Sequence, residues 1–149
     1  MGRIDKENYY LDIAETVLER STCLRRKYGA IIVRNDEIVS TGYNGAPSGL
    51  PSCKERGECL RVKLGIESGT KQELCYAIHA EQNAIIQAAK LGVSIEGATL
   101  YCTNFPCAIC AKMMINAGIK RLIYKYDYPD EFSKELLSMS DMEVVKYEE

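Results

Sequence analysis

The sequence predicts an α/β domain in which a mixed five-stranded sheet lies between helical layers, and two observations support this. Residues 28–34 and 37–43 are rich in β-forming side chains and flank Asn35 and Asp36, a pair typical of a hairpin turn. In the second half of the chain, strand-like and helix-like segments alternate, which favours right-handed crossovers and parallel strands. Because 149 residues suit one core, we expect a single domain over 1–149.

The individual elements follow from the spacing of apolar residues. Residues 9–18 carry apolar side chains at helical spacing, and Asp5 is a candidate N-cap. After the hairpin, residues 44–76 collect glycines, prolines, serines and three cysteines around a short helical piece at 58–65, so we expect an irregular insertion there. The remaining elements are expected, in order, as helix 79–91, strand 98–103, helix 107–117, strand 121–126, helix 131–139 and strand 142–147.

Composition excludes several classes of protein. The hydrophobic fraction of 46% and the charged fraction of 27% are those of an ordinary globular chain, and a net charge of −2 does not favour attraction to nucleic acid. No stretch approaches about 18 apolar residues and no signal peptide is visible, so we expect a cytoplasmic protein without a membrane partner. In a reducing compartment, seven cysteines indicate metal binding or catalysis rather than disulfides.

The most informative cysteines are Cys107 and Cys110, which follow Pro106 at the expected start of a helix. Residues three apart share one face of a helix, so both thiols can reach one metal ion, and the positive helix end lowers their pKa. Taken alone, this CxxC pair is equally typical of a redox pair or of two buried small residues.

His79 and Glu81 favour metal binding over these other interpretations of the CxxC pair. His79 is the only histidine of the chain and stands at the expected start of the preceding helix. Together with Cys107 and Cys110 it supplies three ligands and leaves the fourth tetrahedral position open, as in catalytic zinc sites. Two thiolates make the site formally neutral, so the metal acidifies its water less strongly and a nearby base is needed. Glu81 is the candidate for that base and for returning the proton.

The pattern H-x-E followed by P-C-x-x-C is the signature of zinc-dependent nucleobase deaminases. Over residues 22–126 the chain resembles the cytidine deaminase-like superfamily and, within it, the deoxycytidylate deaminases. That resemblance implies a three-layer α-β-α fold. It also implies hydrolytic replacement of the amine at C4 of dCMP, which yields dUMP for thymidylate synthesis. The resemblance is carried by residues 23–30, 42–49, 79–85 and 106–112.

Substrate contacts are expected outside the metal ligands. On sequence alone Asn44 belongs to a turn, but the resemblance implies that it contacts the deoxyribose and that Ala80 contributes to substrate binding. Arg26, within the basic triplet 25–27, is the expected phosphate contact because its planar fork matches phosphate oxygens, although such triplets are often simply solvated. Tyr126 or Tyr128 is expected to close the site, with exposure in a loop as the alternative.

Four further cysteines suggest a second metal site. Cys23, Cys53, Cys59 and Cys75 could form a closed tetrahedral zinc site that stabilises the insertion, with buried unligated thiols as the alternative. Cys102 lies in an expected strand and is assigned to the core.

The resemblance also implies regulation and assembly. It implies a homo-oligomer, commonly a hexamer, that dCTP activates and dTTP inhibits, with Mg²⁺ accompanying the effector. The candidate effector loop contains Gly45, Ser48 and Gly49. One alternative is a deaminase of tRNA adenosine or of another nucleobase or nucleoside, which the acidic pI and the 42–49 motif disfavour. Another is a non-catalytic nucleotide-binding module associated with DNA uptake, which Glu81 disfavours.

Overall fold

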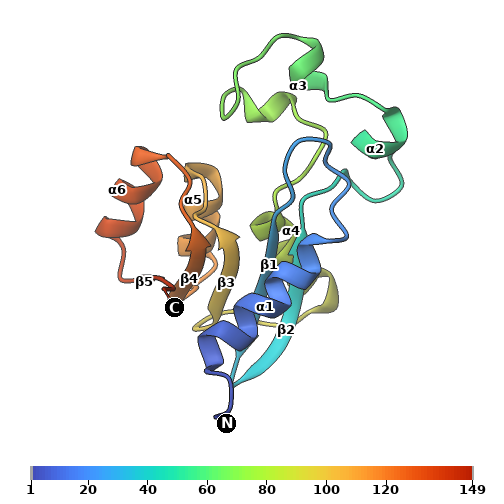
Figure 1. Cartoon of the computed structure of the whole chain (residues 1–149). Coiled ribbons are helices and arrows are strands. Elements are labelled where there is room, and N and C mark those ends of the chain that lie inside the picture. The colour runs from blue at the N-terminus through green and yellow to red at the C-terminus, as the bar shows by residue number, and fades with distance from the viewer. Residues whose placement is uncertain (1, 149) are drawn as a thin grey trace.

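The computed structural model describes residues 2–148 and contains one mixed sheet with the strand order β2-β1-β3-β4-β5 (Figure 1). β1 runs antiparallel to both β2 and β3, whereas β3, β4 and β5 are parallel to one another. Asn35 and Asp36 adopt positive φ angles of 52° and 60° in the hairpin turn, so both the predicted sheet and its turn are confirmed. The strands are β1 Gly29–Arg34, β2 Glu37–Tyr43, β3 Thr99–Asn104, β4 Arg121–Tyr126 and β5 Glu143–Lys146.

Helices cover both faces of this sheet and give the expected three layers. Consecutive residues of a strand point to opposite faces, so Ile31 joins the core under α1 while Ile32 joins the core under α4 and α5. α6 packs beside α5. No helix within residues 2–148 combines the length and the apolar character needed to cross a membrane. The helices of these layers are α1 Lys6–Leu18, α4 Ala80–Leu91, α5 Ala108–Asn116 and α6 Glu131–Met139.

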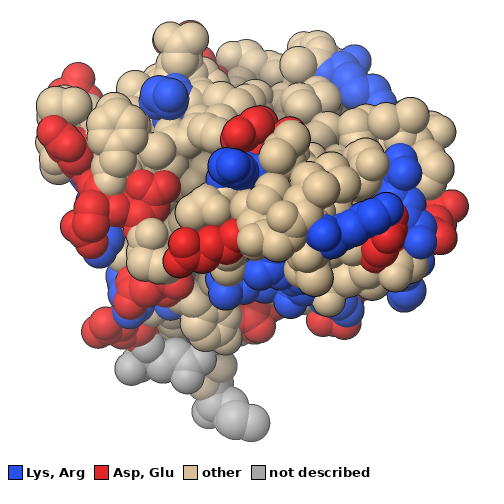
Figure 2. Space-filling model, turned by 90° about the horizontal axis from the view of Figure 1, so that it is seen from above, with Lys and Arg blue, Asp and Glu red and all other residues tan. Residues whose placement is uncertain are grey.

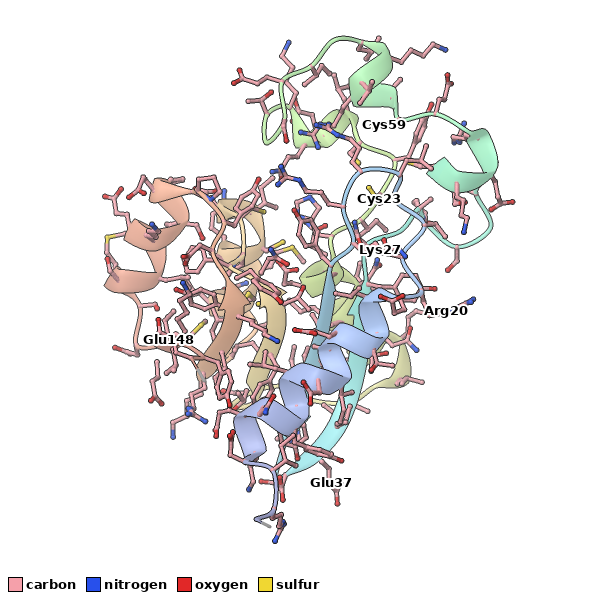
Figure 3. The ribbon with its side chains drawn as sticks, viewed as in Figure 1. Arg20, Cys23, Lys27, Glu37, Cys59 and Glu148 are labelled. Atoms are coloured by element: carbon pink, nitrogen blue, oxygen red, sulfur yellow. The ribbon has the colours of Figure 1, made fainter. Side chains whose placement is uncertain are left out.

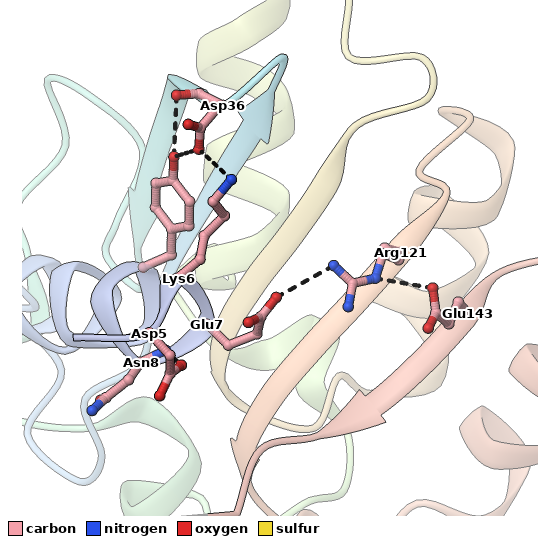
Figure 4. Close-up of polar contacts among 8 residues, drawn as sticks. Asp5, Lys6, Glu7, Asn8, Asp36, Arg121 and Glu143 are labelled. Atoms are coloured by element: carbon pink, nitrogen blue, oxygen red, sulfur yellow. Dashed lines mark hydrogen bonds and ion pairs between the residues drawn. The ribbon is translucent and has the colours of Figure 1, made fainter. Parts of the chain in front are cut away.

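Polar contacts attach α1 to the turn between β1 and β2 and to β4 (Figure 4). Asp5 caps its first turn, as the sequence predicted. The hydroxyl of Tyr10 donates to Oδ1 of Asp36 in the hairpin turn at 2.5 Å, and Glu7 lies 3.6 Å from the guanidinium of Arg121 on β4. α1 therefore fixes the hairpin against the parallel part of the sheet.

Several bounds differ from the prediction by one to three residues; for example, α1 begins at Lys6 rather than at residue 9, and β3 covers Thr99–Asn104 rather than 98–103. Helices α4 and α5 begin one residue later than expected, so that His79 and Cys107 are their N-caps rather than their first helical residues. The insertion also holds more structure than predicted, above the end of the sheet in Figure 1. Only α3 falls within the expected helical piece, because α2 and η1 are too short for periodicity to reveal them. The three elements are α2 Cys53–Arg56, α3 Leu60–Lys63 and η1 Gln72–Leu74.

Candidate metal centre and its cavity

The start of α4 is held tightly against β2. A Cβ atom at Gly42 would lie 2.3 Å from the carbonyl oxygen of Ala80, so only glycine allows the first turn of α4 to approach this strand. The side-chain amide of Asn83 donates to the carbonyl of Tyr43 at 2.8 Å and joins the same two elements. The backbone position of His79 is thereby fixed by the sheet.

The start of α5 is fixed by residues that the sequence did not single out. Oδ2 of Asp130 accepts a hydrogen bond from the backbone N–H of Ala108 at 2.9 Å, directly after the N-cap Cys107. The hydroxyl of the fully buried Ser133 donates to the carbonyl of Pro106 at 2.7 Å. Asp130 stands immediately before the predicted helix 131–139, and that capping position was the available signal.

The three predicted metal ligands meet between these helix starts. Nδ1 of His79 lies 3.2 Å from Sγ of Cys110 and 3.4 Å from Sγ of Cys107. All three ligand atoms lie within 4.8 Å of one another. Ligands of a tetrahedral zinc with ordinary Zn–N and Zn–S bonds are about 3.6 Å apart. One imidazole and two thiols in this arrangement fit zinc and leave one coordination position for water or substrate.

The electrostatics of the cysteine pair also suit a metal. The pKa of Cys107 falls to about 4 because Cys110 and His79 donate hydrogen bonds to its thiolate and outweigh the effect of burial. The hydrogen bond between Cys110 and Cys107, followed by burial, raises the pKa of Cys110. Burial lowers the pKa of His79, but the hydrogen bond and charge of Cys107 outweigh it and raise that pKa. A bound divalent cation provides the charge needed to deprotonate both thiols.

Glu81 is buried beside these ligands, with 8% of its surface exposed. Burial raises the pKa of its carboxyl group above the usual value, and the neighbouring charge of His79 only partly opposes this. A carboxyl group whose proton is held more tightly than usual can both accept a proton and return it near neutral pH. The arrangement therefore places a group that could carry a proton beside the candidate metal site.

His79, Cys107 and Glu81 line one cavity that the core and the insertion share, whereas Cys110 is buried and is not among the described lining residues. Arg25, Arg26 and Arg61 all line it, and among its described lining residues Glu81 is the one carboxylate. This cavity therefore suits an anionic ligand. The outer face at the insertion end looks different, because acidic and basic side chains are interspersed there without forming a continuous basic surface (Figure 2).

Asn44 lines the cavity, but its amide holds the neighbouring loop in place. Oδ1 accepts hydrogen bonds from the hydroxyl of Ser21 at 2.6 Å and from the backbone N–H of Tyr28 at 2.9 Å. Nδ2 donates to the carbonyl of Arg26 at 2.9 Å. Asn44 is thus an anchor of the loop before β1, and its contact with a sugar stays a prediction.

The other predicted substrate residues divide into two groups. Tyr128 lines the cavity, whereas Tyr126 lies outside the lining and is 51% exposed. Arg26 lines the cavity with an exposed side chain. Ala80 is fully buried and is absent from the described lining.

Arg61 and Gln72 are lining residues that the sequence did not reveal. Nε and Nη2 of Arg61 and Oε1 of Gln72 are buried and have no hydrogen-bond partner among residues 2–148. Arg61 belongs to the expected helical piece at 58–65, but nothing in its local spacing indicates that it reaches the cavity.

The four remaining candidate ligands gather where the loop before β1 meets the insertion, and Figure 3 labels Cys23 and Cys59 there. All four thiols are free, and burial followed by the charges of Cys75, Cys23 and Cys59 raises the pKa of Cys53. Within residues 2–148, however, no three of these sulfurs reach the mutual spacing of 4.8 Å that the first site shows.

The candidate effector loop lies apart from the cavity lining. Gly45 pairs with Ile78 through two backbone hydrogen bonds of 3.1 and 2.8 Å, which help to position the start of α4. Ser48 and Gly49 are exposed in the following turn and are not among the described lining residues.

Comparison with known proteins connects this site to a family. The model of the cytidine and deoxycytidylate deaminase zinc-binding region matches residues 4–126. The deoxycytidylate deaminase of Schizosaccharomyces pombe is 32% identical over 142 residues, which are 95% of this chain and 44% of that protein. ComE operon protein 2 of Bacillus subtilis is 36% identical over 149 residues, which are 99% of this chain and 74% of that protein. The chain thus spans less than half the length of the yeast relative.

A solved structure shows the same similarity in three dimensions. The dCMP deaminase from the cyanophage S-TIM5, in complex with dCMP and dUMP, superposes with a TM-score of 0.80 and 34% sequence identity. The match covers 97% of this chain and 100% of the phage chain. The resemblance therefore includes the whole α-β-α arrangement.

Proposed function

The chain belongs to the cytidine and deoxycytidylate deaminase zinc-binding family, and from this membership we propose that it hydrolyses dCMP to dUMP and ammonia. The assignment to the zinc-dependent deaminases follows from the family and from the close grouping of His79, Cys107 and Cys110. The observation that carries the choice of dCMP is the cavity. It brings two of the metal ligands, His79 and Cys107, and Glu81 together with three arginines, which suit the phosphate of a nucleotide. The structure of the phage relative with dCMP and dUMP supports this choice.

The residues of the site have distinct roles in this reaction. His79, Cys107 and Cys110 would hold zinc, which supplies a Lewis acid that lowers the pKa of a water molecule at the open position. The Glu81 carboxylate accepts one proton from the attacking water and delivers it to the ring nitrogen of cytosine. It then carries the second proton from the oxygen now bound to C4 to the amine, so that the C4–N bond breaks, ammonia leaves and the C4 carbonyl forms. Burial of Glu81 keeps bulk water away from this transfer.

A substrate comparison tests the proposal. Ammonia release should be measured with dCMP, CMP, deoxycytidine, adenosine and tRNA as alternative substrates at equal enzyme and zinc concentrations. We expect dCMP to give the highest kcat/KM. Higher kcat/KM with an unphosphorylated nucleoside or with tRNA would contradict the assignment.

We also propose that Cys23, Cys53, Cys59 and Cys75 bind a second, structural zinc. Their proximity, their free thiols and the irregular insertion that they connect support this proposal. Metal analysis should find about two zinc ions per wild-type chain and about one after Cys59→Ser substitution. Cys102→Ala, which removes a buried core thiol, is the matched control and should keep both ions. One zinc ion in the wild-type protein would refute the second site.

The family further supports a proposal of regulated assembly. We propose a homo-oligomer, a hexamer by analogy, that dCTP activates and dTTP inhibits with Mg²⁺, through the loop containing Gly45, Ser48 and Gly49. Exposed apolar side chains on α4 and α5, including Leu91 at 62% and Ile109 at 45%, are available for subunit contacts. Light scattering coupled to size-exclusion chromatography measures the mass. A monomer whose activity ignores both nucleotides would contradict this proposal.

A further inference from the structure

The guanidinium of Arg61 is the most unusual polar group of the cavity. Its Nε and Nη2 atoms are buried and lack partners among the described residues. These two nitrogens form one edge of the guanidinium, where their N–H bonds run parallel and match two oxygens of a single phosphate or carboxylate group. Burying a cation without a partner is unfavourable, so this edge is suited to an anion brought by a ligand.

Apart from Glu81, no side chain among the described lining residues supplies a phosphate-like or carboxylate group. Glu81 itself lies beside the metal ligands. Arg61 and the metal ligand His79 both line this cavity. A ligand held by Arg61 therefore occupies the same cavity as the reacting centre.

The two other arginines of the cavity already have protein partners. Nη1 of Arg26 donates to the hydroxyl of Tyr28 at 3.5 Å, and Arg25 forms a hydrogen bond with the thiol of Cys59. Both of these arginines are also exposed, so water competes for their remaining donors. Among the three, Arg61 has the strongest requirement for a ligand.

The insertion also fixes Arg61 in its position. Arg61 is the second residue of α3, whose N-cap is Cys59, and its backbone carbonyl accepts a hydrogen bond from the N–H of Ile66 at 2.8 Å. In the same cavity lining, Nε2 of Gln72 donates to the hydroxyl of Tyr128 at 3.0 Å, while its Oε1 has no partner among residues 2–148. The insertion therefore presents both an unpaired cation and an unpaired acceptor to a ligand.

We propose that Arg61 binds the 5′-phosphate of the substrate nucleotide through Nε and Nη2, so that the insertion selects nucleotides over nucleosides. This inference rests on the proposed function and assigns the main phosphate contact to Arg61 instead of Arg26. Arg61 is a specificity residue because it contacts the phosphate, while the proton transfer belongs to Glu81.

The test compares kcat/KM for dCMP and deoxycytidine in matched variants. In Arg61→Gln we expect kcat/KM for dCMP to fall about 100-fold, as for loss of one partner from a buried charge pair. The value for deoxycytidine should change less than about threefold, since that substrate lacks the phosphate. The kcat/KM of Arg61→Lys for dCMP should lie between those of wild type and Arg61→Gln. A lysine keeps the positive charge but cannot donate two parallel hydrogen bonds to one phosphate.

Arg56→Gln is the matched control from the same insertion. The guanidinium of Arg56 lies over the ring of Tyr76 at 3.8 Å, and its Nε donates to the carbonyl of Pro51, outside the cavity. This variant should keep the wild-type preference for dCMP. An equal loss of preference in Arg56→Gln and Arg61→Gln would overturn the assignment to Arg61.

Thermal stability separates a ligand contact from a structural role. Without ligand, Arg61→Gln should unfold at the wild-type temperature or above, because the substitution removes an unpaired buried charge. The rise in Tm that dUMP causes in wild type should be largely lost, while zinc content stays the same. If Arg61→Gln is too unstable to purify, Arg61 supports the fold and the proposal fails.

The outcomes also separate this inference from the proposed function. A wild-type protein that prefers deoxycytidine, or that releases ammonia from neither substrate, contradicts the proposed function itself. A wild-type protein that prefers dCMP while Arg61→Gln keeps that preference contradicts only the role of Arg61.

Discussion

The two halves of the site are built on different kinds of structure. The metal ligands and Glu81 stand at the starts of α4 and α5, which pack on the sheet and are held by Gly42 and Asp130. The other half belongs to the insertion, whose helices have only three or four residues and whose surface is largely exposed. Bond-making chemistry thus lies on rigid elements, while substrate selection relies on a segment that can change without rebuilding the core.

The difference extends to what stabilises each half. The core half is supported by the buried apolar side chains of the sheet and its helices, which exclude water from Glu81. Several large apolar residues of the insertion are instead exposed, among them Val62 at 59% and Leu64 at 55%. The insertion therefore depends on caps, side-chain hydrogen bonds and the proposed cysteine-bound metal. Segments of this kind open more easily than a core.

The largest expected effect is on the core half. Cys110→Ser removes one of the three metal ligands, so we expect loss of the catalytic zinc and no measurable ammonia release. Metal analysis and the ammonia assay check this prediction. Cys59→Ser, in the insertion, should retain measurable turnover, and equal inactivation of both variants would remove the distinction between the two halves.

A smaller effect is expected when only the support of a ligand is removed. Asp130→Ala deletes the acceptor for the N–H of Ala108, next to Cys107. We expect about 10- to 100-fold weaker zinc affinity or activity, as for residues that orient metal ligands. Zinc titration with a competing chelator measures the affinity. Lys134→Ala, which removes an exposed ion pair one turn along the same helix, is the control, and an equal effect there would contradict the role of Asp130.

The smallest effect on activity is expected on the opposite face of the sheet. Tyr101 is 2% exposed under α1, and burial raises its pKa to about 12. An unfolded tyrosine ionises near pH 10, so this group contributes stability that is fully present below about pH 10 and is lost as pH rises toward the folded value. Tyr101→Phe should flatten the decline of Tm above about pH 10 and leave ammonia release at pH 8 unchanged. An unchanged pH dependence of Tm would contradict the prediction.

The accuracy of the sequence prediction follows the same division. β4 and α6 match their predicted bounds, because a buried face imposes a regular spacing on a strand or helix of this length. The metal ligands were predicted because two short motifs contain them. Arg61 and Gln72 were missed because their importance comes from a cavity that forms only when the insertion folds over the core. No local spacing records that proximity.

Proton transfer by Glu81 is the central claim about the rigid half, and one substitution tests it most directly. Glu81→Gln keeps the size of the side chain and removes its ability to exchange a proton. With zinc content equal to wild type, we expect kcat for dCMP to fall at least about 100- to 10,000-fold, the usual contribution of general acid–base catalysis. Binding of dUMP should persist, because the phosphate contact lies in the insertion. Wild-type kcat in a zinc-loaded Glu81→Gln protein would contradict the account.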